Sequence, residues 1–390
     1  MPNIPNNLKV EQYIELTYND KNETNATINK TLQNYLHTIK CEIDGKQDTW
    51  DKYKKFTNPY EYIHTPIPLS KMSICKLKPL SRSFYKMIEI ANAISLLDKL
   101  PTPFKSFHFA EGPGGFIEAM CQLTKNNIVN THYGMTLIDD DNSTVPGWKK
   151  SHNFLDNHSN VIIDNGADGT GNLFVLKNLK YCIEKYAQQM HFVTADGGFD
   201  FSTDFNKQEL SGLQLLLAQV IYAIAVQKKG GYFVIKFFDT FTQPSIDILY
   251  MLAMVYSNIQ IIKPCTSRHA NSEKYIICNN FCLSDSNTVV NKLADILFDM
   301  LKNNKTPKSF LKVPPPQYFV VRLEECNAIL GQQQIESISN TLSLIENVRN
   351  DKIENMKKIN IQKCIYWCQK HHLPYHKTIS TTNIIYCIKM

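Results

Sequence analysis

The sequence predicts an α/β protein built around a mostly parallel sheet of seven strands, because short apolar runs alternate with segments of helical periodicity over about 180 residues. Strands that are joined by helical segments need crossover connections, which make neighbouring strands parallel. Only a short loop separates the last two predicted strands, so we expect these two to pair antiparallel. The predicted strands are residues 106–112, 132–137, 160–164, 191–197, 231–237, 259–264 and 273–281.

The chain of 390 residues is long enough for one large α/β domain with further segments, and its 43% hydrophobic content is typical of a soluble globular protein. Its 42 Lys and Arg residues against 36 Asp and Glu give a formal net charge of +6. This charge permits a nucleic-acid ligand only if the basic residues cluster. Eleven cysteines follow no regular pairing and no signal peptide or membrane-spanning run is visible. We therefore expect an intracellular, reducing environment.

Composition and periodicity divide the chain into three predicted regions. Residues 1–80 are polar and weakly periodic, which predicts an N-terminal extension with one or two short helices. Residues 81–285 contain the predicted sheet, preceded by a helix over 81–100 for which Ser81 is a candidate N-cap. Residues 286–390 predict a mostly helical C-terminal appendage whose function the sequence does not reveal. Within the central region, further helices are predicted at 116–125, 207–228 and 243–256.

Three glycines follow the first predicted strand, in "FAEGPGGF" (109–116). Glycines let a ligand approach the backbone closely, and the N–H groups at a helix start can donate to an anionic or polar ligand. The pattern is neither the Gly-x-Gly-x-x-Gly of dinucleotide sites nor a phosphate-binding loop, and a tight turn without a ligand is the alternative. With a polar tip on the second strand, the turn suits a ligand with an amino-acid tail and a nucleoside, such as S-adenosylmethionine.

Charged residues lie where three later strands meet the same sheet edge. Asp196 ends the strand in "HFVTADGGFDFS" (191–202), although a helix cap or turn aspartate is the alternative. Lys236 ends an apolar strand, so we expect a carboxylate nearby or a lowered pKa, unless its ammonium reaches the surface. Glu273 begins the last strand after a polar loop, and Lys86 lies on the predicted helix that precedes the sheet.

Together these residues resemble the Lys-Asp-Lys-Glu tetrad of the FtsJ-type RNA ribose 2′-O-methyltransferases, and among them of the cap-specific mRNA enzymes of eukaryotes and large DNA viruses. The resemblance covers about residues 54–281 and implies a Rossmann-like, S-adenosylmethionine-dependent methyltransferase fold. Ala110-Glu111 stands where the family more often has Ala or Cys-Ala, and Asn172 stands where it usually has an acidic residue. The similar blocks are "TNPYE" (57–61), "SRSFYKM" (81–87), "EGPGGF" (111–116), "GMTL" (134–137), "GADGTGN" (166–172), "ADGGF" (195–199), "QLLLAQ" (214–219), "GGYFVIKFFDTFT" (230–242) and "KPCTSRHANSEKYIIC" (263–278).

The resemblance implies that a ribose 2′-oxygen attacks the sulfonium methyl group of S-adenosylmethionine, without a metal. Lys236 would be the base, with Lys86, Asp196 and Glu273 completing the catalytic set. A lysine has a reference pKa of about 10.4, so burial and the second cation, Lys86, would have to lower the pKa of Lys236. The residues expected near the cofactor are Ala110, Glu111, Gly112, Pro113, Gly114, Gly115, Phe116, Met135, Thr136, Asp168, Asn172, Leu173 and Asp196.

The expected substrate is RNA, with the first transcribed nucleotide of capped mRNA as the methyl acceptor and other capping enzymes as potential partners. Methylation of uncapped ribosomal or transfer RNA, and an inactive RNA-binding scaffold with the same fold, are the alternatives. A viral protein would be cytoplasmic and a cellular one nuclear. Each residue expected to face RNA could equally be an ordinary surface residue; these residues are Lys54, Lys55, Asn206, Lys207, Gln208, Ser267, Arg268 and Asn271.

A second cluster of chemically active side chains lies in "CIYWCQKHHLPYH" (364–376). It contains two cysteines and three histidines, which are common zinc ligands. Their spacing is not that of a zinc finger, and no second ligand pair lies at a typical distance. We therefore expect an ordinary helix here and no metal.

Overall fold

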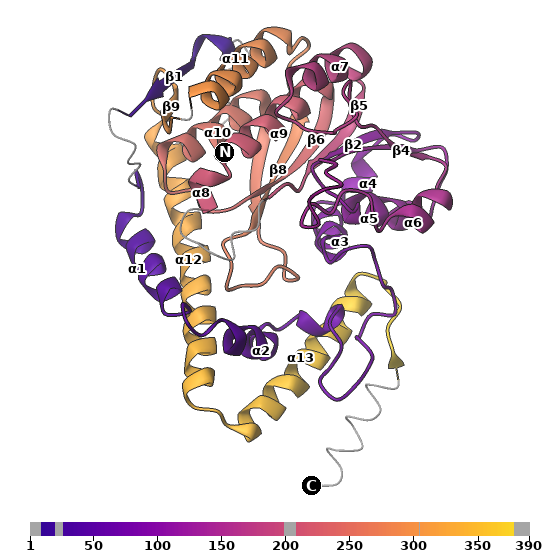
Figure 1. The fold of residues 1–390 in the computed structure, drawn as a ribbon, viewed down its shortest axis with the longest axis vertical. Helices are drawn as coiled ribbons and strands as arrows, with labels where there is room; N and C mark the ends of the chain where they lie inside the picture. Colours follow the sequence, from indigo (N-terminus) through magenta and orange to yellow (C-terminus); the bar gives the residue numbers. More distant parts are fainter. Residues whose placement is uncertain (1–8, 20–25, 199–207, 304, 378–390) are drawn as a thin grey trace.

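The protein is described from a computed structural model that covers residues 9–19, 26–198, 208–303 and 305–377 (Figure 1). Its centre is a seven-stranded sheet in the order β4-β3-β2-β5-β6-β8-β7. Only β8 runs antiparallel to its neighbours, so the predicted mixed sheet with an antiparallel last strand is confirmed. The strands are β2 (Lys105–Phe109), β3 (Thr131–Met135), β4 (Val161–Ile163), β5 (Met190–Ala195), β6 (Gln227–Phe237), β7 (Tyr256–Ile262) and β8 (Lys274–Phe281).

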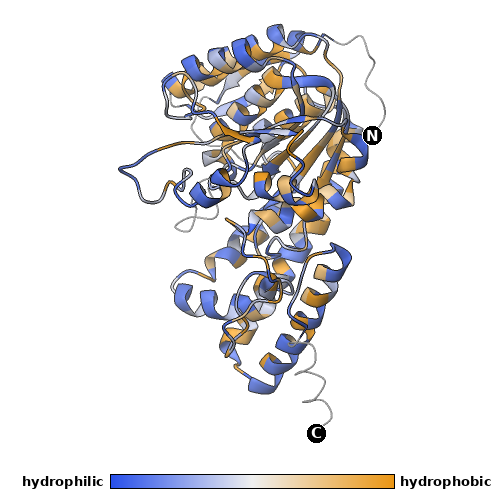
Figure 2. Ribbon diagram, turned by 90° about the vertical axis from the view of Figure 1, so that its right-hand side faces the viewer, coloured by the Kyte–Doolittle hydropathy of each residue, from blue (hydrophilic) through white to orange (hydrophobic). Residues whose placement is uncertain are grey.

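Helices cover both faces of this sheet, because side chains alternate between the faces along each strand. Along β5, Val193 and Ala195 belong to one hydrophobic core and Phe192 to the other. Figure 2 shows apolar residues concentrated in the strands and on the helix surfaces turned toward them. The first core is formed with α7 (Leu176–Tyr186), α9 (Leu213–Val226), α10 (Gln243–Val255) and α11 (Asn287–Asn303), and the second with α3 (Ser83–Ala93), α5 (Gly115–Leu123) and α13 (Asn350–Lys370).

Two predicted helices are each divided in the structure. The one predicted over 81–100 forms α3 and the short α4 (Leu96–Lys99), because Ser95 between them takes a left-handed conformation with φ of 48°. The helix begins two residues after the candidate cap, yet the Ser81 hydroxyl still accepts a hydrogen bond from the Ser83 N–H at 3.3 Å. The other divided segment gives α8 (Gln208–Ser211) and α9, and a further short helix, α6 (His152–Asp156), precedes β4.

The N-terminal extension contains more structure than the predicted one or two short helices. Its helices are α1 (Lys30–Cys41) and α2 (Gln47–Thr57), with 3₁₀ turns η1 (Val10–Gln12) and η2 (Glu61–Ile63). It also supplies β1 (Ile14–Tyr18), which pairs antiparallel with β9 (Pro307–Leu311). We did not predict this small sheet, because its two strands lie almost 300 residues apart and neither has a distinctive local pattern.

We call α12 (Gln317–Glu346) and α13 the C-terminal arm. Figure 1 shows α12 running alongside the sheet and α13 returning beneath it, next to α2. The arm packs against the N-terminal extension, since α12 contacts α1 and α2 while α13 contacts α2 and η2. Within the described residues, no helix combines the length and apolar character needed to cross a membrane.

The indole of Trp367 anchors α13 to α3. Its ring is 3% exposed, and its Nε1–H donates to Glu89 Oε2 at 3.2 Å. It also packs edge-on against Tyr85, with 5.9 Å between ring centroids. We predict that Trp367→Ala lowers the free energy of unfolding by about 3–5 kcal/mol in urea denaturation, because it leaves a large cavity and removes one hydrogen bond of the Glu89 carboxylate. The neighbouring Tyr366 is 68% exposed, so Tyr366→Ala should change the free energy of unfolding by less than about 0.5 kcal/mol. Equal losses in the two variants would contradict this role of Trp367.

Candidate active site

Strand register brings the four predicted catalytic residues to one edge of the sheet. Ala195 of β5 pairs with Ile235 of β6, so the residues that follow them, Asp196 and Lys236, stand side by side. On the other side of β6, Lys236 pairs with Tyr275 of β8, and Glu273 directly precedes that strand. The fourth residue, Lys86, projects toward them from α3.

The four side chains form two ion pairs in a nearly buried setting. Lys86 Nζ lies 2.6 Å from Glu273 Oε1, and Lys236 Nζ lies 3.3 Å from Asp196 Oδ1. All four side chains are at most 12% exposed. Because an unpaired charge would be costly at this depth, the alternation of cations and anions is what makes the cluster stable.

Burial and pairing act in opposite directions on these groups. Burial lowers the pKa of Lys86, although the carboxylates of Glu273 and Asp196 oppose this shift. Burial also disfavours the Glu273 carboxylate, but the Lys86 and Lys236 ammonium groups outweigh it and hold the pKa of Glu273 well below its usual range. The site therefore keeps a permanent negative charge next to two lysines.

Two hydroxyl groups orient the carboxylates: that of Tyr275, which we did not predict, and that of Ser267, which we expected to face RNA. Tyr275 donates to Asp196 Oδ1 at 2.8 Å, and Ser267 donates to Glu273 Oε1 at 2.8 Å. Burial and the neighbouring Asp196 raise the pKa of Tyr275 well above its usual value, so its hydroxyl stays a donor. The period of two along a strand could have revealed Tyr275, because it lies on the same face of β8 as the side chain of Glu273.

Gly197 and Gly198 follow Asp196 where the chain passes close to its neighbours. The Gly197 N–H donates to Gln219 Oε1 at 2.8 Å, and a Cβ at Gly197 would lie 2.9 Å from the Cβ of Ala110. A Cβ at Gly198 would lie 3.2 Å from Lys236 Nζ. A side chain at either position would therefore press on the ends of the catalytic strands.

The glycine turn "EGPGG" connects β2 to α5 beside the end of β3. The Gly112 N–H donates to Thr136 Oγ1 at 3.2 Å, and Ala110 N–H donates to the Met135 carbonyl at 2.7 Å. Gly114 has a φ of 102°, which a residue with a side chain would rarely adopt. Among the residues expected near the cofactor, Ala110, Gly112, Asn172 and Asp196 are half-buried and Asp168 is exposed, whereas Pro113, Gly114, Gly115, Phe116, Met135, Thr136 and Leu173 are buried.

Glu111 of the same turn is directed into the protein core. Its Oε1 accepts the Ile117 N–H at 2.9 Å, and its Oε2 accepts the Thr194 hydroxyl at 3.3 Å. Burial raises the pKa of Glu111 well above its usual range. The carboxyl group thus secures the start of α5, and only the backbone of Glu111 lies at the turn.

The loop after β4 carries polar groups at the same edge of the sheet. Asp168 Oδ1 accepts hydrogen bonds from Thr170 and Asn178, which lower the pKa of Asp168. Asn172 Oδ1 accepts the Phe174 N–H at 2.9 Å and so shapes the loop. The close approach of Gly171 to Thr136, whose carbonyl oxygen would lie 2.0 Å from an added Cβ, places this loop against the end of β3.

These strand ends have the chemistry that S-adenosylmethionine requires. The exposed Asp168 carboxylate could accept hydrogen bonds from nucleoside groups, and Asp196 places a negative charge where a sulfonium cation would be stabilised. Gly112 and Gly197 allow a ligand to approach the backbone at the ends of β2 and β5. The residues present therefore fit the cofactor.

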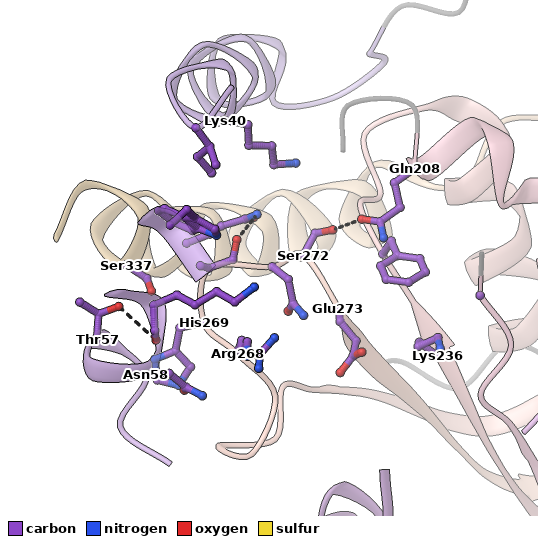
Figure 3. Close-up of a pocket in the computed structure, with 18 residues that line it drawn as sticks. Lys40, Thr57, Asn58, Gln208, Lys236, Arg268, His269, Ser272, Glu273 and Ser337 are labelled. Carbon is purple, nitrogen blue, oxygen red and sulfur yellow. Dashed lines mark hydrogen bonds between the residues drawn. The ribbon is translucent and has the colours of Figure 1, made fainter. Parts of the chain in front are cut away.

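A cavity of about 350 Å³ opens on the other side of Lys236 (Figure 3). Its walls come from α1 and α2, from α12, and from the loop 263–273, while Lys236 and Glu273 line it next to the sheet. Figure 3 shows the side chains of these elements converging on the space in front of Lys236. The lining includes Lys40, Trp50, Lys54, Gln208, Arg268, His269, Asn271 and Gln334.

Of the residues expected to face RNA, four line this cavity. Lys54 is paired with Asp51 at 2.5 Å, and Gln208 accepts a hydrogen bond from Ser272. Asn271 is exposed and accepts from Lys263. The fourth is Arg268.

Arg268 is tied to a buried carboxylate of the N-terminal extension. Its Nη2 and Nε donate to Glu61 Oε1 and Oε2 at 2.7 and 3.1 Å. Burial opposes the Glu61 charge, but Arg268 outweighs it and holds the pKa of Glu61 well below its usual range. Ser267 is buried on Glu273 and Lys55 is exposed outside the cavity lining, while Asn206 and Lys207 lie outside the described residues.

The two cysteines of α13 and His371, which follows this helix, are held by core packing and by a hydrogen bond. Cys364 and Cys368 are buried in the second core, and His371 Nδ1 shares a hydrogen bond with Asn92 at 2.9 Å. Over the residues that the structure describes, no group of three or more His, Cys, Asp or Glu side chains could hold a metal ion.

We predict that Glu273→Gln destabilises the protein by about 3–5 kcal/mol at pH 7, because Lys86 is left buried without its partner. The pKa of Glu273 is lower in the folded state than its ordinary value of 4.5, so the wild type loses this stabilisation as the pH falls below 4.5. Urea denaturation at several pH values should therefore show the two proteins converging in acid. The matched control, Glu354→Gln, removes a 59% exposed carboxylate and should cost less than about 1 kcal/mol. A constant difference across pH would refute the assignment to Glu273.

Comparison with known proteins gives a consistent result. Residues 79–281, just over half of the chain, match the FtsJ-like methyltransferase family. The cap-specific mRNA (nucleoside-2′-O-)-methyltransferase 2 of Pongo abelii is 26% identical over 374 residues, covering 91% of this chain and 46% of that protein. Corresponding methyltransferases 1 of Dictyostelium discoideum and Leishmania braziliensis are 28% and 30% identical, covering 80% and 64% of this chain and 42% and 63% of theirs. The chain thus spans about half the length of the first of these relatives.

Residues 79–281, with the four charged residues gathered at one sheet edge, make this chain a member of the FtsJ-like methyltransferase family.

Proposed function

We propose that this protein transfers a methyl group from S-adenosylmethionine to a ribose 2′-hydroxyl of RNA, at the first transcribed nucleotide of capped mRNA. The observation that carries the proposal is the position of Lys236, which lies between the glycine-lined strand ends and the cavity. The names of the relatives favour a capped mRNA over other RNA.

Residues on one side of Lys236 would hold the cofactor. Gly112 and Gly197 leave room at the ends of β2 and β5, and Asp168 and Asn172 lie in the loop after β4. When bound, S-adenosylmethionine supplies an electrophilic methyl group on a sulfonium cation. Asp196 then has two functions, since its carboxylate pairs with Lys236 and also stabilises positive charge at the strand ends.

Lys236 is the proposed general base. In its neutral form its Nζ would accept the proton of the ribose hydroxyl, which is a poor nucleophile while protonated. Asp196 orients this amine from one side. Lys86 and Glu273 form the second pair beside it. Holding the attacking oxygen in line with the methyl group should contribute much of the rate.

The cavity on the other side of Lys236 would receive the acceptor nucleotide. Its volume of about 350 Å³ lies within the range of ligand pockets. Lys40 and Lys54 bring cations to its lining, each paired with a carboxylate that a phosphate would have to replace, and Trp50 and His269 add aromatic rings. We also propose that the protein works inside the cell, alongside the enzymes that build the cap.

We predict that Lys236→Met reduces methyl transfer to a short capped RNA by about two to four orders of magnitude, because the general base is lost. Radiolabelled S-adenosylmethionine and RNAs with or without the cap would measure the rate. Lys312→Met, a change on the exposed end of the distant β9, should retain wild-type activity.

The acceptor position is tested with the same assay. A capped RNA that already carries a 2′-O-methyl group on its first nucleotide should not be labelled. If the wild type labels uncapped RNA as fast as capped RNA, the enzyme modifies RNA of another class. If it labels no RNA while still binding it, the alternative of an inactive scaffold is correct.

We predict that Gly198→Ala lowers kcat about tenfold or more. The added Cβ would lie 3.2 Å from Lys236 Nζ, and displacement of a catalytic group by a fraction of an ångström is costly. Gly198 is exposed, so the melting temperature should hardly change. A variant with full activity would show that Lys236 can move without loss, contrary to its proposed role.

A further inference from the structure

One face of α13 carries a line of exposed side chains, which we call the α13 stripe: Ile359, Lys363, Tyr366 and Lys370. They are separated by four, three and four residues, the spacing that places side chains in a row along one side of a helix. Ile359 is 45% and Tyr366 68% exposed, so both can contact a ligand. The opposite face of the helix is buried in the second core.

The second half of α13 is positively charged. The acidic residues of this helix, Asp351 and Glu354, lie at its start and are paired with Arg349 and Lys357. After Glu354 the helix sequence contains lysines but no Asp or Glu. Among the ion pairs found between described residues, none includes Lys363 or Lys370. The stripe thus offers two cations and an aromatic ring to a ligand.

The helix that carries the stripe lies next to the loop that forms one wall of the cavity. Glu89 of α3 connects the two, because it accepts the Trp367 indole N–H and the backbone N–H groups of Cys265 and Thr266. His269 of this loop lines the cavity, and the pKa of His269 is lowered by burial and by the charges of Lys263 and Lys363. Asn360, the neighbour of Ile359 on α13, donates to the Asn58 carbonyl at 3.4 Å, and Asn58 lines the cavity. The helix that carries the stripe therefore borders the cavity wall, so a ligand leaving the cavity there would reach the stripe.

We propose that the α13 stripe binds the RNA strand on the 3′ side of the acceptor nucleotide, an inference that rests on the proposed function. A row of lysines with an exposed tyrosine suits a single strand, whose phosphates need cations and whose bases stack on aromatic rings. From Ile359 to Lys370 the helix rises by eleven steps of 1.5 Å, or about 16 Å. That length accommodates several nucleotides, whereas only the cap lies on the 5′ side of a first nucleotide.

The test compares capped RNAs of 4 and 20 nucleotides bound to the full chain, with affinity measured by fluorescence anisotropy at several KCl concentrations. The wild type should bind the longer RNA more tightly. In the double variant Lys363→Gln/Lys370→Gln, affinity for the longer RNA should fall about tenfold or more. Its dependence on salt, as the slope of log K against log [KCl], should become shallower by roughly 1.4. Tyr366→Ala should lower the affinity for the longer RNA about tenfold, because a base can no longer stack on the tyrosine ring.

Binding of the 4-nucleotide RNA and its methylation at saturation should be unchanged in these variants. The matched control, Lys302→Gln/Lys308→Gln, removes two exposed lysines far from the cavity and should leave both RNAs unaffected. Equal losses on the short and the long RNA, or no loss on either, would overturn the proposal, and the second result would leave the stripe as a contact for a protein. If the wild type methylates neither RNA, the proposed function fails, yet the length-dependent binding would still support the stripe.

Discussion

The arrangement of this protein depends on keeping two ammonium groups and two carboxylates together at the nearly buried edge of a sheet. Removing a charge from water costs several kcal/mol, so each of these groups is tolerated only while its partner stays within a few ångströms. The pairing of β5, β6 and β8 fixes three of them through the backbone, since Asp196, Lys236 and Glu273 all lie at ends of neighbouring strands. Lys86 comes from a helix, so its position has to be secured by packing.

That packing involves the C-terminal arm. Tyr85 and Glu89, which flank Lys86 on α3, both contact Trp367 of α13. The Glu89 carboxylate also holds the backbone of the loop that leads to Glu273, through the N–H groups of residues 265 and 266. One carboxylate thus sets the helix that carries Lys86 against the loop that carries its partner. A change at Trp367 should therefore alter the active site without touching it.

Most of the sheet, and the charged residues that gather at its edge from the strands, could be predicted from the sequence, because both depend on short-range patterns. Lys86 was expected from the family resemblance. Apolar runs of strand length and a charged residue at the end of each run are visible locally, as with Asp196 and Lys236. Contacts between residues far apart in the sequence could not be predicted, such as the pairing of β1 with β9 or of Arg268 with Glu61. The orientation of Glu111 was also hidden, since its core-facing carboxyl is held by Thr194 from another strand.

The chemistry and the choice of acceptor are encoded in different parts of the chain. The carboxylates and Lys236 of the proposed catalytic set lie at strand ends, whereas the cavity walls come mainly from α1, α2, α12 and the loop before β8. The Glu61–Arg268 pair joins the N-terminal extension to that loop, and Gln334 of α12 donates to the Ala270 carbonyl at 3.1 Å. Through these contacts, segments that precede the sheet in the sequence and segments that follow it form one cavity together. The same sheet could therefore serve another acceptor if these flanking segments changed, while the ion pairs beneath remained as they are.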